Sequence, residues 1–162
     1  MPSSSTKGKR EIFDWFIEQE GIKTIVDVGC GSGTYPKLLG KKYYWIGVEI
    51  FERYVEQFSL NSIYNEVILG DILNVDLPEA DCIIFGDVLE HLEKHEAVGL
   101  IKKANEKYGH IVISIPLEYY QGEYMGNVYE IHKSIWTWEE LLKVIPESFM
   151  RVKFDNIAVF IK

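Results

Sequence analysis

Cysteine and long apolar runs are both scarce in this chain. Only two of its 162 residues are cysteine, Cys30 and Cys82, and each stands in an apolar stretch. Two such thiols are typical of reduced, buried side chains in a reducing compartment. No apolar run approaches the ~18 residues of a membrane span, and residues 1–10 lack the hydrophobic core of a secretory signal. We therefore expect a cytoplasmic protein without a membrane span.

Basic residues are also few relative to acidic ones. Lys and Arg total 17 against 25 Asp and Glu, which gives a net charge of −8. Affinity for nucleic acid comes largely from Lys and Arg at phosphates, so this balance disfavours a nucleic-acid partner. A local basic patch can coexist with a negative total, and an RNA substrate therefore stays open. A small molecule is the favoured partner, and nothing in the sequence indicates the oligomeric state.

The chain does contain a regular alternation of strand-like and helix-like segments. Its length and its 47% hydrophobic content fit one globular domain, which we place at residues 10–162 behind a flexible tail of residues 1–9. Nearly continuous apolar strands alternating with helices indicate an α/β fold, with a parallel sheet covered on both faces. The expected strands are 24–28, 44–49, 66–69, 81–85 and 110–115, and the expected helices are 10–20, 35–39, 51–58 and 91–107.

The C-terminal part of the chain departs from this alternation. Thr137 and Glu140 have the spacing of a capping box, which predicts a helix over 138–144. Two further strands, 150–154 and 157–161, flank the dipeptide Asp-Asn, a typical two-residue hairpin connection. We therefore expect an antiparallel hairpin at the end of the parallel sheet.

A glycine-rich loop follows the first expected strand. Gly29, Gly31 and Gly33 alternate in the segment VDVGCGSGT, before a helix. In the dinucleotide fingerprint G-x-G-x-x-G the third glycine comes one residue later, which disfavours a nicotinamide-dependent oxidoreductase. Asp27 precedes the first glycine, and a carboxylate there suits a ligand with an ammonium group. The loop therefore predicts a close approach of the backbone to a cationic ligand.

Acidic residues also end the second and third expected strands. Glu49 can accept hydrogen bonds from both hydroxyls of a ribose, as in other nucleotide-binding folds. Asp71 can accept from the amino group of an adenine, while Ile72 packs on the ring. The carboxyl ends of these strands therefore predict an adenosine-binding edge.

Together these features resemble the class I S-adenosylmethionine-dependent methyltransferases, for which the loop VDVGCGSGT is among the most specific signals. The resemblance implies a Rossmann-like fold with a seven-stranded sheet in the order 3-2-1-4-5-7-6, and S-adenosylmethionine as cofactor. It places the methionine part on Asp27 and the glycines, the ribose on Glu49, the adenine on Asp71 and Ile72, and the sulfonium beside Gly86 and Asp87. The whole predicted cofactor set is Asp27, Gly29, Cys30, Gly31, Gly33, Glu49, Ile50, Asp71, Ile72, Gly86 and Asp87.

A second group of polar residues follows the fourth expected strand. Asp87, Glu90 and His91 have the spacing of one helical turn, so we expect them to share a face. Such a face is a metal half-site, an acid–base pair, or simply a helix start that favours acids. His132 lies in the long connection 117–136, whose tyrosines either pack the loop or form an aromatic wall around an acceptor.

This group resembles two kinds of metal-assisted methyltransferase, the ubiquinone-biosynthesis O-methyltransferases and the small-RNA 2′-O-methyltransferases. The resemblance implies a divalent ion on Asp87, Glu90, His91 and His132, although the first acid is usually Glu in those groups. Carboxylate and imidazole ligands favour Mg²⁺ or Mn²⁺ over zinc. Without a metal, His91 or His132 would be the catalytic base, with Glu90 beside it.

The favoured function is S-adenosylmethionine-dependent O-methylation of a small hydroxylated acceptor. Two alternatives stay open, an RNA-terminal 2′-O-methyltransferase and a catalytically silent cofactor-binding protein. DNA amino-methylation is disfavoured, because the fifth expected strand runs into Ser-Ile-Pro-Leu at 114–117 in place of that family's Asn/Asp-Pro-Pro-aromatic tetrad.

Overall fold

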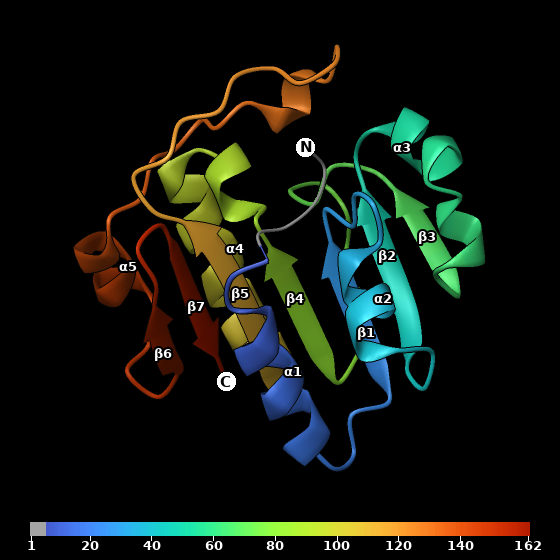
Figure 1. Cartoon of the computed structure of the whole chain (residues 1–162), viewed down its shortest axis with the longest axis horizontal. Coiled ribbons are helices and arrows are strands. Elements are labelled where there is room, and N and C mark those ends of the chain that lie inside the picture. The colour runs from blue at the N-terminus through green and yellow to red at the C-terminus, as the bar shows by residue number, and fades with distance from the viewer. Residues whose placement is uncertain (1–5) are drawn as a thin grey trace.

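The structure of the protein is a computed structural model, and it describes residues 6–162. A seven-stranded sheet with the order β3-β2-β1-β4-β5-β7-β6 forms its centre (Figure 1). Neighbouring strands are parallel except at β5–β7 and β6–β7, which are antiparallel. The strands are β1 (Thr24–Val28), β2 (Tyr44–Glu49), β3 (Glu66–Leu69), β4 (Cys82–Gly86), β5 (His110–Pro116), β6 (Met150–Lys153) and β7 (Ile157–Ile161). The predicted strand order and C-terminal hairpin are confirmed.

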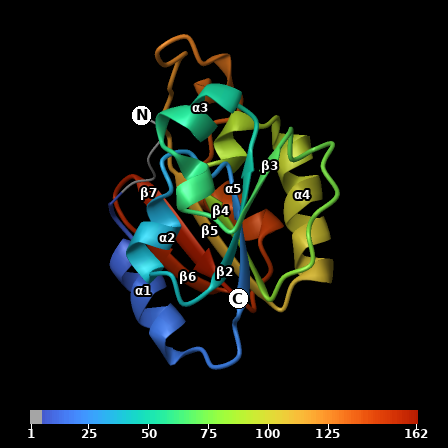
Figure 2. The ribbon, with the colours of Figure 1, turned by 90° about the vertical axis from the view of Figure 1, so that its right-hand side faces the viewer.

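Helices cover both faces of this sheet. In Figure 2, α1 and α2 lie on one side of the strands and α4 lies on the other. The helices are α1 (Lys9–Glu18), α2 (Thr34–Leu39), α3 (Glu52–Gln57), α4 (Lys94–Lys107) and α5 (Trp138–Val144), and three 3₁₀ turns are η1 (Leu60–Ser62), η2 (Leu89–His91) and η3 (Val128–Glu130). No helix in residues 6–162 is both long enough and apolar enough to cross a membrane.

Two hydrophobic cores result, one on each face. Along β4, Cys82 and Ile84 belong to the core under α1 and α2, while Ile83 and Phe85 belong to the core under α4 and α5. All four side chains are fully buried. Side chains alternate between the faces of a strand, so a central strand covered on both sides must be apolar throughout. This explains the continuous apolar runs in the sequence.

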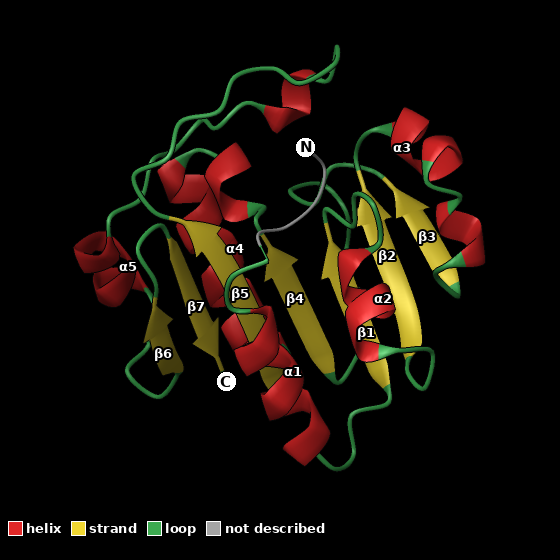
Figure 3. Ribbon diagram, viewed as in Figure 1, coloured by secondary structure: helices red, strands yellow, loops and turns green. Residues whose placement is uncertain are grey.

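The chain between β3 and β4 contains no helix, and Figure 3 shows it as loop.

The C-terminal region follows the prediction more closely. The hydroxyl of Thr137 accepts a hydrogen bond from the amide of Glu140, whose carboxylate accepts one from the amide of Thr137 in turn. This capping box fixes the start of α5.

The start of the longest helix differs from the prediction. We expected a helix from His91, but η2 ends there, Leu92 is extended, and α4 begins at Lys94. Glu93 and Glu96 form a capping box at this point and supply hydrogen-bond partners for the first helical turn. The prediction that Asp87, Glu90 and His91 share one helical face is therefore wrong.

The predicted tail also ends earlier than expected. Residues 1–5 of that tail lie outside the described residues. Lys9 is buried, with 9% of its surface exposed, and it begins α1. Gly8 precedes it with φ of 78°, and a Cβ atom on Gly8 would lie 2.4 Å from Cγ2 of Val159. The prediction that the tail extends to residue 9 is thus wrong, because a glycine lets this segment pack directly against β7.

Candidate active site

A cavity of about 460 Å³ opens at the carboxyl edge of the sheet. Its walls come from the ends of β1, β2 and β4 and from the long loop between β5 and α5, which rises above the sheet in orange in Figure 1. Open parallel sheets typically bind ligands at this edge. The cavity is lined by every predicted cofactor residue except Gly33, namely Asp27, Gly29, Cys30, Gly31, Glu49, Ile50, Asp71, Ile72, Gly86 and Asp87.

The loop after β1 needs glycine for its backbone conformation. Gly29, Gly31 and Gly33 have φ of 60°, 48° and 74°, in the left-handed region where other residues are strained. At Gly29 a Cβ atom would also lie 2.5 Å from Cγ2 of Val88. Gly33 does not line the cavity; it forms the N-cap of α2.

Hydrogen bonds hold this loop against the end of β2. The amides of Gly29 and Cys30 share the carbonyl oxygen of Val48, at 2.8 and 3.2 Å. The amide of Gly31 donates to Oε2 of Glu49 at 2.9 Å. The loop is therefore fixed in place by the two residues that end β2.

Asp27 lies beneath the loop and is almost fully buried, with 2% of its surface exposed. The hydroxyl of Tyr64 donates to its Oδ2 at 2.6 Å. Burial raises the pKa of this carboxyl to about 7, and the Tyr64 hydrogen bond and the charge of Lys9 oppose that rise. A buried carboxylate that forms no ion pair with another described residue is poised to receive a cationic group.

Replacing Asp27 by asparagine is expected to raise the melting temperature at pH 8 and to leave it nearly unchanged at pH 4. The pKa is about 7 in the folded state and about 4 when unfolded. The wild type therefore loses stability as the pH rises between these values, because the buried group must release its proton. Asparagine keeps an acceptor for Tyr64 and removes the charge. Thermal unfolding at both pH values tests this, with the exposed Asp14→Asn as control, and an equal shift at both would contradict it.

Two of the three other predicted acids of the cofactor site, Glu49 and Asp71, accept hydrogen bonds from backbone amides. Glu49 is buried and accepts from the amide of Phe51 at 2.9 Å through Oε1, besides its bond to the glycine loop. Burial raises the pKa of Glu49, and these amide bonds oppose the rise. Asp71 accepts from the amide of Leu73 at 2.9 Å and from Nδ2 of Asn74 at 3.2 Å. Both carboxylates thus face the cavity in fixed positions.

The end of β4 forms the middle of the cavity wall. The ring of Tyr35 packs against Gly86 so closely that a Cβ atom there would lie 2.2 Å from Cε2 of the ring. Asp87 follows with φ of 58°, a strained value for this residue type. Its Oδ1 accepts a hydrogen bond from the hydroxyl of Ser114 at 2.7 Å. Strain of this kind is common where a side chain must be aimed at a site.

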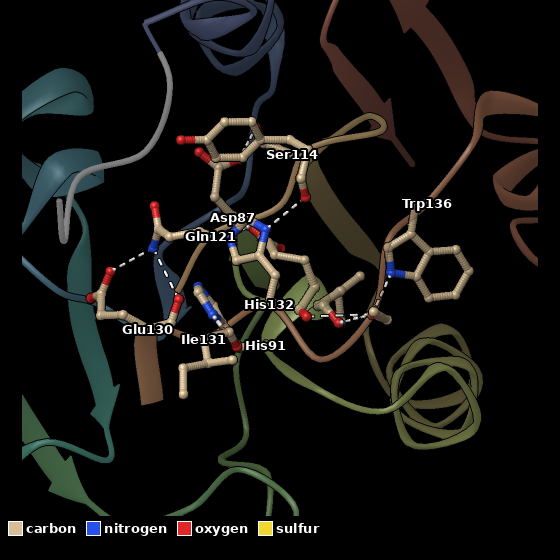
Figure 4. A network of polar contacts seen from close by, with 12 residues as sticks. Asp87, His91, Ser114, Gln121, Glu130, Ile131, His132 and Trp136 are labelled. Carbon is tan, nitrogen blue, oxygen red and sulfur yellow. Dashed lines mark hydrogen bonds and ion pairs between the residues drawn. The ribbon is translucent and has the colours of Figure 1, made fainter. Parts of the chain in front are cut away.

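Three of the four predicted metal ligands come together deeper in the cavity. One ligand atom each from Glu90, His91 and His132 lies within 4.8 Å of the other two. Nε2 of His132 is 3.9 Å from Oε1 of Glu90, and the two imidazole rings are 4.9 Å apart between centroids (Figure 4). Asp87 lines the same cavity but does not belong to this group, and its Oδ1 accepts from the hydroxyl of Ser114. These three residues are called the Glu–His–His cluster below.

Backbone carbonyls orient both histidines of the cluster. The carbonyl oxygen of Ile131 lies 3.3 Å from Nδ1 of His91, and that of Tyr119 lies 3.0 Å from Nδ1 of His132. A carbonyl accepts, so Nδ1 carries the proton and Nε2 keeps its lone pair. Burial lowers the pKa of both imidazoles, that of His91 to about 4 with a further contribution from His132. The histidines are therefore neutral at pH 7, with Nε2 as an available base or ligand.

Glu90 completes the cluster and is nearly fully buried, with 2% of its surface exposed. Its Oε2 has no hydrogen-bond partner among the described residues. Burial, and then the charge of Asp87, raise the pKa of Glu90 well above its usual value. An unsatisfied buried carboxylate oxygen beside two imidazole nitrogens is a donor set that a cation would satisfy.

Further residues of the cavity were not found from the sequence. Glu130, on the long loop, accepts from the hydroxyl of Tyr54 at 3.1 Å and from Nε2 of Gln121 at 3.1 Å. The Tyr54 contact ties the loop to α3, and the Gln121 contact lies within the loop, beside the cluster in Figure 4. Tyr35 forms another part of the wall, and Lys9 lies outside the lining and donates a hydrogen bond to the Tyr35 hydroxyl. No local pattern marks these residues, because only the folded chain brings them to the site.

Comparison with known protein families identifies the domain. A family model described as a methyltransferase domain matches residues 26–113, more than half of the chain. The chain belongs to this methyltransferase family. The matched residues run from β1 to β5 and include the glycine loop, both acidic strand ends and two members of the cluster, Glu90 and His91. The predicted family is thereby confirmed.

Individual relatives agree with this assignment. Isoflavone-7-O-methyltransferase 6 from Medicago sativa is 25% identical over 87 residues, which cover 54% of this methyltransferase-family chain and 25% of the plant protein. The aligned part thus spans a quarter of that relative's length. A second plant protein, isoflavone-7-O-methyltransferase 9, matches to the same extent.

Solved structures share the fold at low sequence identity. An S-adenosylmethionine-dependent methyltransferase from Clostridium acetobutylicum superimposes with a TM-score of 0.70 at 12% identity, over 94% of this chain and 89% of that one. The N-terminal domain of EvdMO1 with S-adenosylhomocysteine bound gives a TM-score of 0.69 at 13% identity, over 98% and 80%. These likenesses confirm the predicted Rossmann-like methyltransferase fold. The narrower resemblance to ubiquinone-biosynthesis and RNA methyltransferases stays a prediction.

Proposed function

We propose that this protein transfers a methyl group from S-adenosylmethionine to a hydroxyl oxygen of a small acceptor. The observation that carries the proposal is the position of the Glu–His–His cluster, which lines the same cavity as the glycine loop. A cofactor held by that loop and an acceptor held at the cluster would therefore meet inside one cavity. Family membership and the O-methyltransferase relatives support this function.

The charges of the cavity suit the cofactor. S-adenosylmethionine carries an ammonium group and a sulfonium, and Asp27 and Asp87 are carboxylates on the wall where the methionine part would lie. Glu49 and Asp71 stand at the ends of β2 and β3, where the ribose and the adenine would lie. The carboxylates proposed for the methionine part, the ribose and the adenine thus stand at the ends of successive strands, as in other nucleotide-binding sheets.

A divalent ion fits the cluster. Glu90 Oε2 lacks a partner among the described residues, and Nε2 of both His91 and His132 keeps its lone pair. These three residues would hold Mg²⁺ or Mn²⁺, with the remaining positions left for water or acceptor oxygens. Such an ion, when bound, lowers the pKa of a coordinated hydroxyl.

The residues of the chain supply positioning and proton transfer. In the reaction the acceptor oxygen forms a bond to the methyl carbon while the carbon–sulfur bond breaks. The electron pair of the broken bond stays on sulfur, so the cofactor becomes S-adenosylhomocysteine. When no ion is bound, the hydroxyl proton passes to Nε2 of His132, and Glu90 at 3.9 Å stabilises the imidazolium that forms. An ion held by this Nε2 would use its lone pair, and the proton of the hydroxyl would then pass to water. Holding the oxygen, methyl and sulfur in line contributes up to about 7–11 kcal/mol.

The acceptor is a small molecule without phosphate groups. Among residues 6–162, Lys133 is the one lysine or arginine that lines the cavity. The described acidic side chains that line it are six: Asp27, Glu49, Asp71, Asp87, Glu90 and Glu130. Such a wall repels a polyanion, and an RNA end is therefore disfavoured. Tyr119 and Tyr129 also line the cavity and are about half exposed, so they offer aromatic faces to a planar acceptor.

Methyl transfer from labelled S-adenosylmethionine tests the proposed function. The protein is incubated with catechols, ribonucleosides, short RNA and amines, and the products are identified by mass spectrometry. We expect a labelled methyl ether on a small hydroxylated acceptor. Labelling of RNA alone, or of amines alone, would overturn the choice of acceptor, and cofactor binding without transfer to any of these compounds would favour a silent binding protein.

Glu49→Ala is expected to weaken binding of S-adenosylhomocysteine by about 1–3 kcal/mol, because it leaves the ribose hydroxyls without an acceptor. The amides of Gly31 and Phe51 lose their partner as well, so the loop also loosens. Isothermal titration calorimetry measures the change. Glu52→Ala, at an exposed position on α3, is the matched control and should bind like the wild type. Equal affinity in the two variants would show that Glu49 does not contact the cofactor.

A further inference from the structure

The long loop between β5 and α5 brings one basic side chain to the acceptor end of the cavity. Lys133 follows His132 directly and lines the cavity. Its positive charge acts on the Glu–His–His cluster (Figure 4), because it contributes to the lowered pKa of His91, after burial and the neighbouring His132. The ammonium is therefore close to the place where the acceptor hydroxyl is proposed to bind.

The backbone on both sides of Lys133 is fixed. The amide of His132 donates to the carbonyl oxygen of Gln121 at 2.9 Å, and the amide of Ser134 donates to that of Glu90 at 3.0 Å. His132 and Ser134 are buried, whereas Lys133 between them is exposed. The lysine is thus anchored beside the cluster, and its ammonium lies at the cavity rim, where a ligand can reach it.

This ammonium has no partner in the described part of the chain. Among residues 6–162, the side chain of Lys133 forms no ion pair and no hydrogen bond. The buried carboxylate of Glu130, on the same loop, is engaged by Tyr54 and Gln121 instead. Unpaired lysines are common on open surfaces, but this one lines a cavity whose other charged side chains are acidic. A single cation in that position suits one anionic group of a ligand.

The surroundings of Lys133 favour a carboxylate on an aromatic ring. A carboxylate has one negative charge, and the acidic wall opposes a group with more. The ring of Tyr119 lies 5.5 Å from that of His132 between centroids, and it lines the cavity with 51% of its surface exposed. An aromatic acceptor can therefore pack on Tyr119, with its hydroxyl toward the cluster and its carboxylate toward the rim.

We propose that Lys133 binds a carboxylate on the acceptor, so that the protein selects a hydroxylated aromatic acid as its substrate. This inference rests on the proposed function and narrows its class of acceptor. The ion pair at the rim would hold one end of the acceptor while the hydroxyl at the other end meets the methyl group. Lys133 is then a residue that determines specificity, and the proton transfer stays with the cluster.

Three catechols with a two-carbon side chain test the inference: dihydrocaffeate, ethylcatechol and dopamine, in which that chain carries a carboxylate, a hydrogen atom and an ammonium respectively. Calorimetry measures their binding to the protein saturated with S-adenosylhomocysteine, and product formation gives KM and kcat. The wild type should bind dihydrocaffeate about 2- to 5-fold more tightly than ethylcatechol, as expected for one accessible ion pair. Lys133→Met should lose this difference, and Lys133→Glu should reverse it in favour of dopamine. Binding of ethylcatechol should stay the same in all three proteins.

The matched control is Lys103→Met, which removes an exposed lysine of α4 outside the cavity and should leave all three affinities unchanged. A wild type that methylates catechols without preferring the carboxylate would overturn the role of Lys133 and leave the proposed function intact. A preference that survives in Lys133→Met would do the same. If none of the three catechols is bound or methylated, the small hydroxylated acceptor of the proposed function is itself contradicted, and the inference falls with it.

Discussion

Replacing His132 by alanine is expected to reduce methyl transfer by at least about 100-fold, the usual contribution of a positioned acid or base. Binding of S-adenosylhomocysteine should change little. His132 presents its Nε2 to the acceptor side of the cavity, 3.9 Å from Glu90, and it lies outside the predicted cofactor residues. The variant should therefore separate the two halves of the site. Rates with saturating cofactor and calorimetry of the product measure the two effects.

The control for this variant is His95→Ala, which removes an exposed histidine from α4 and should keep full activity. Chelation with EDTA adds a second comparison. If a divalent ion acts at the cluster, EDTA should lower the wild-type rate and have little further effect on His132→Ala, because both changes remove the same function. Full wild-type activity in EDTA would remove the metal from the mechanism and leave His132 as base. Normal turnover by His132→Ala would refute the role of the cluster.

The sheet was predictable because each strand carries its own local signal. Strands such as Cys82–Gly86 and Ile157–Ile161 are short apolar runs bounded by polar residues, and a sheet buried on both faces requires such runs. The hairpin was predictable because Asp155 and Asn156 stand between two apolar segments. The predicted cofactor residues other than Gly33 line one cavity for the same reason, because parallel strands bring their carboxyl ends to one edge.

The parts of the site that escaped prediction depend on contacts between distant segments. Asp87 has the spacing of a helical turn with Glu90, but its backbone enters the left-handed region and its carboxylate turns to Ser114. Lys9 lies in a segment whose composition is that of a tail, and its burial comes from Gly8 and Tyr35, which no local pattern links to it. Spacing predicts which residues can meet on one element, whereas packing decides which residues meet between elements.

Gly29→Ala is expected to have the largest effect on the fold and on cofactor binding together. A non-glycine residue at φ of 60° costs about 1–2 kcal/mol. The new methyl group would lie 2.5 Å from Cγ2 of Val88, and overpacking of this kind adds about 1–3 kcal/mol. The loop relieves this contact by moving away from the end of β2, so its amide bonds to Val48 weaken and cofactor binding should fall by more than about 10-fold.

Two further variants separate the two causes. Gly126→Ala has φ of 78° and nothing within 4 Å of its new Cβ, so it carries the backbone cost alone, and Gly126 does not line the cavity. The double variant Gly29→Ala/Val88→Ala removes the close contact and leaves the backbone cost. Denaturant unfolding should therefore show a lower free energy of unfolding for Gly29→Ala than for Gly126→Ala. The double variant should regain cofactor affinity in part, because Val88 no longer displaces the loop. If Gly29→Ala binds S-adenosylhomocysteine as the wild type does, the glycine loop does not hold the cofactor.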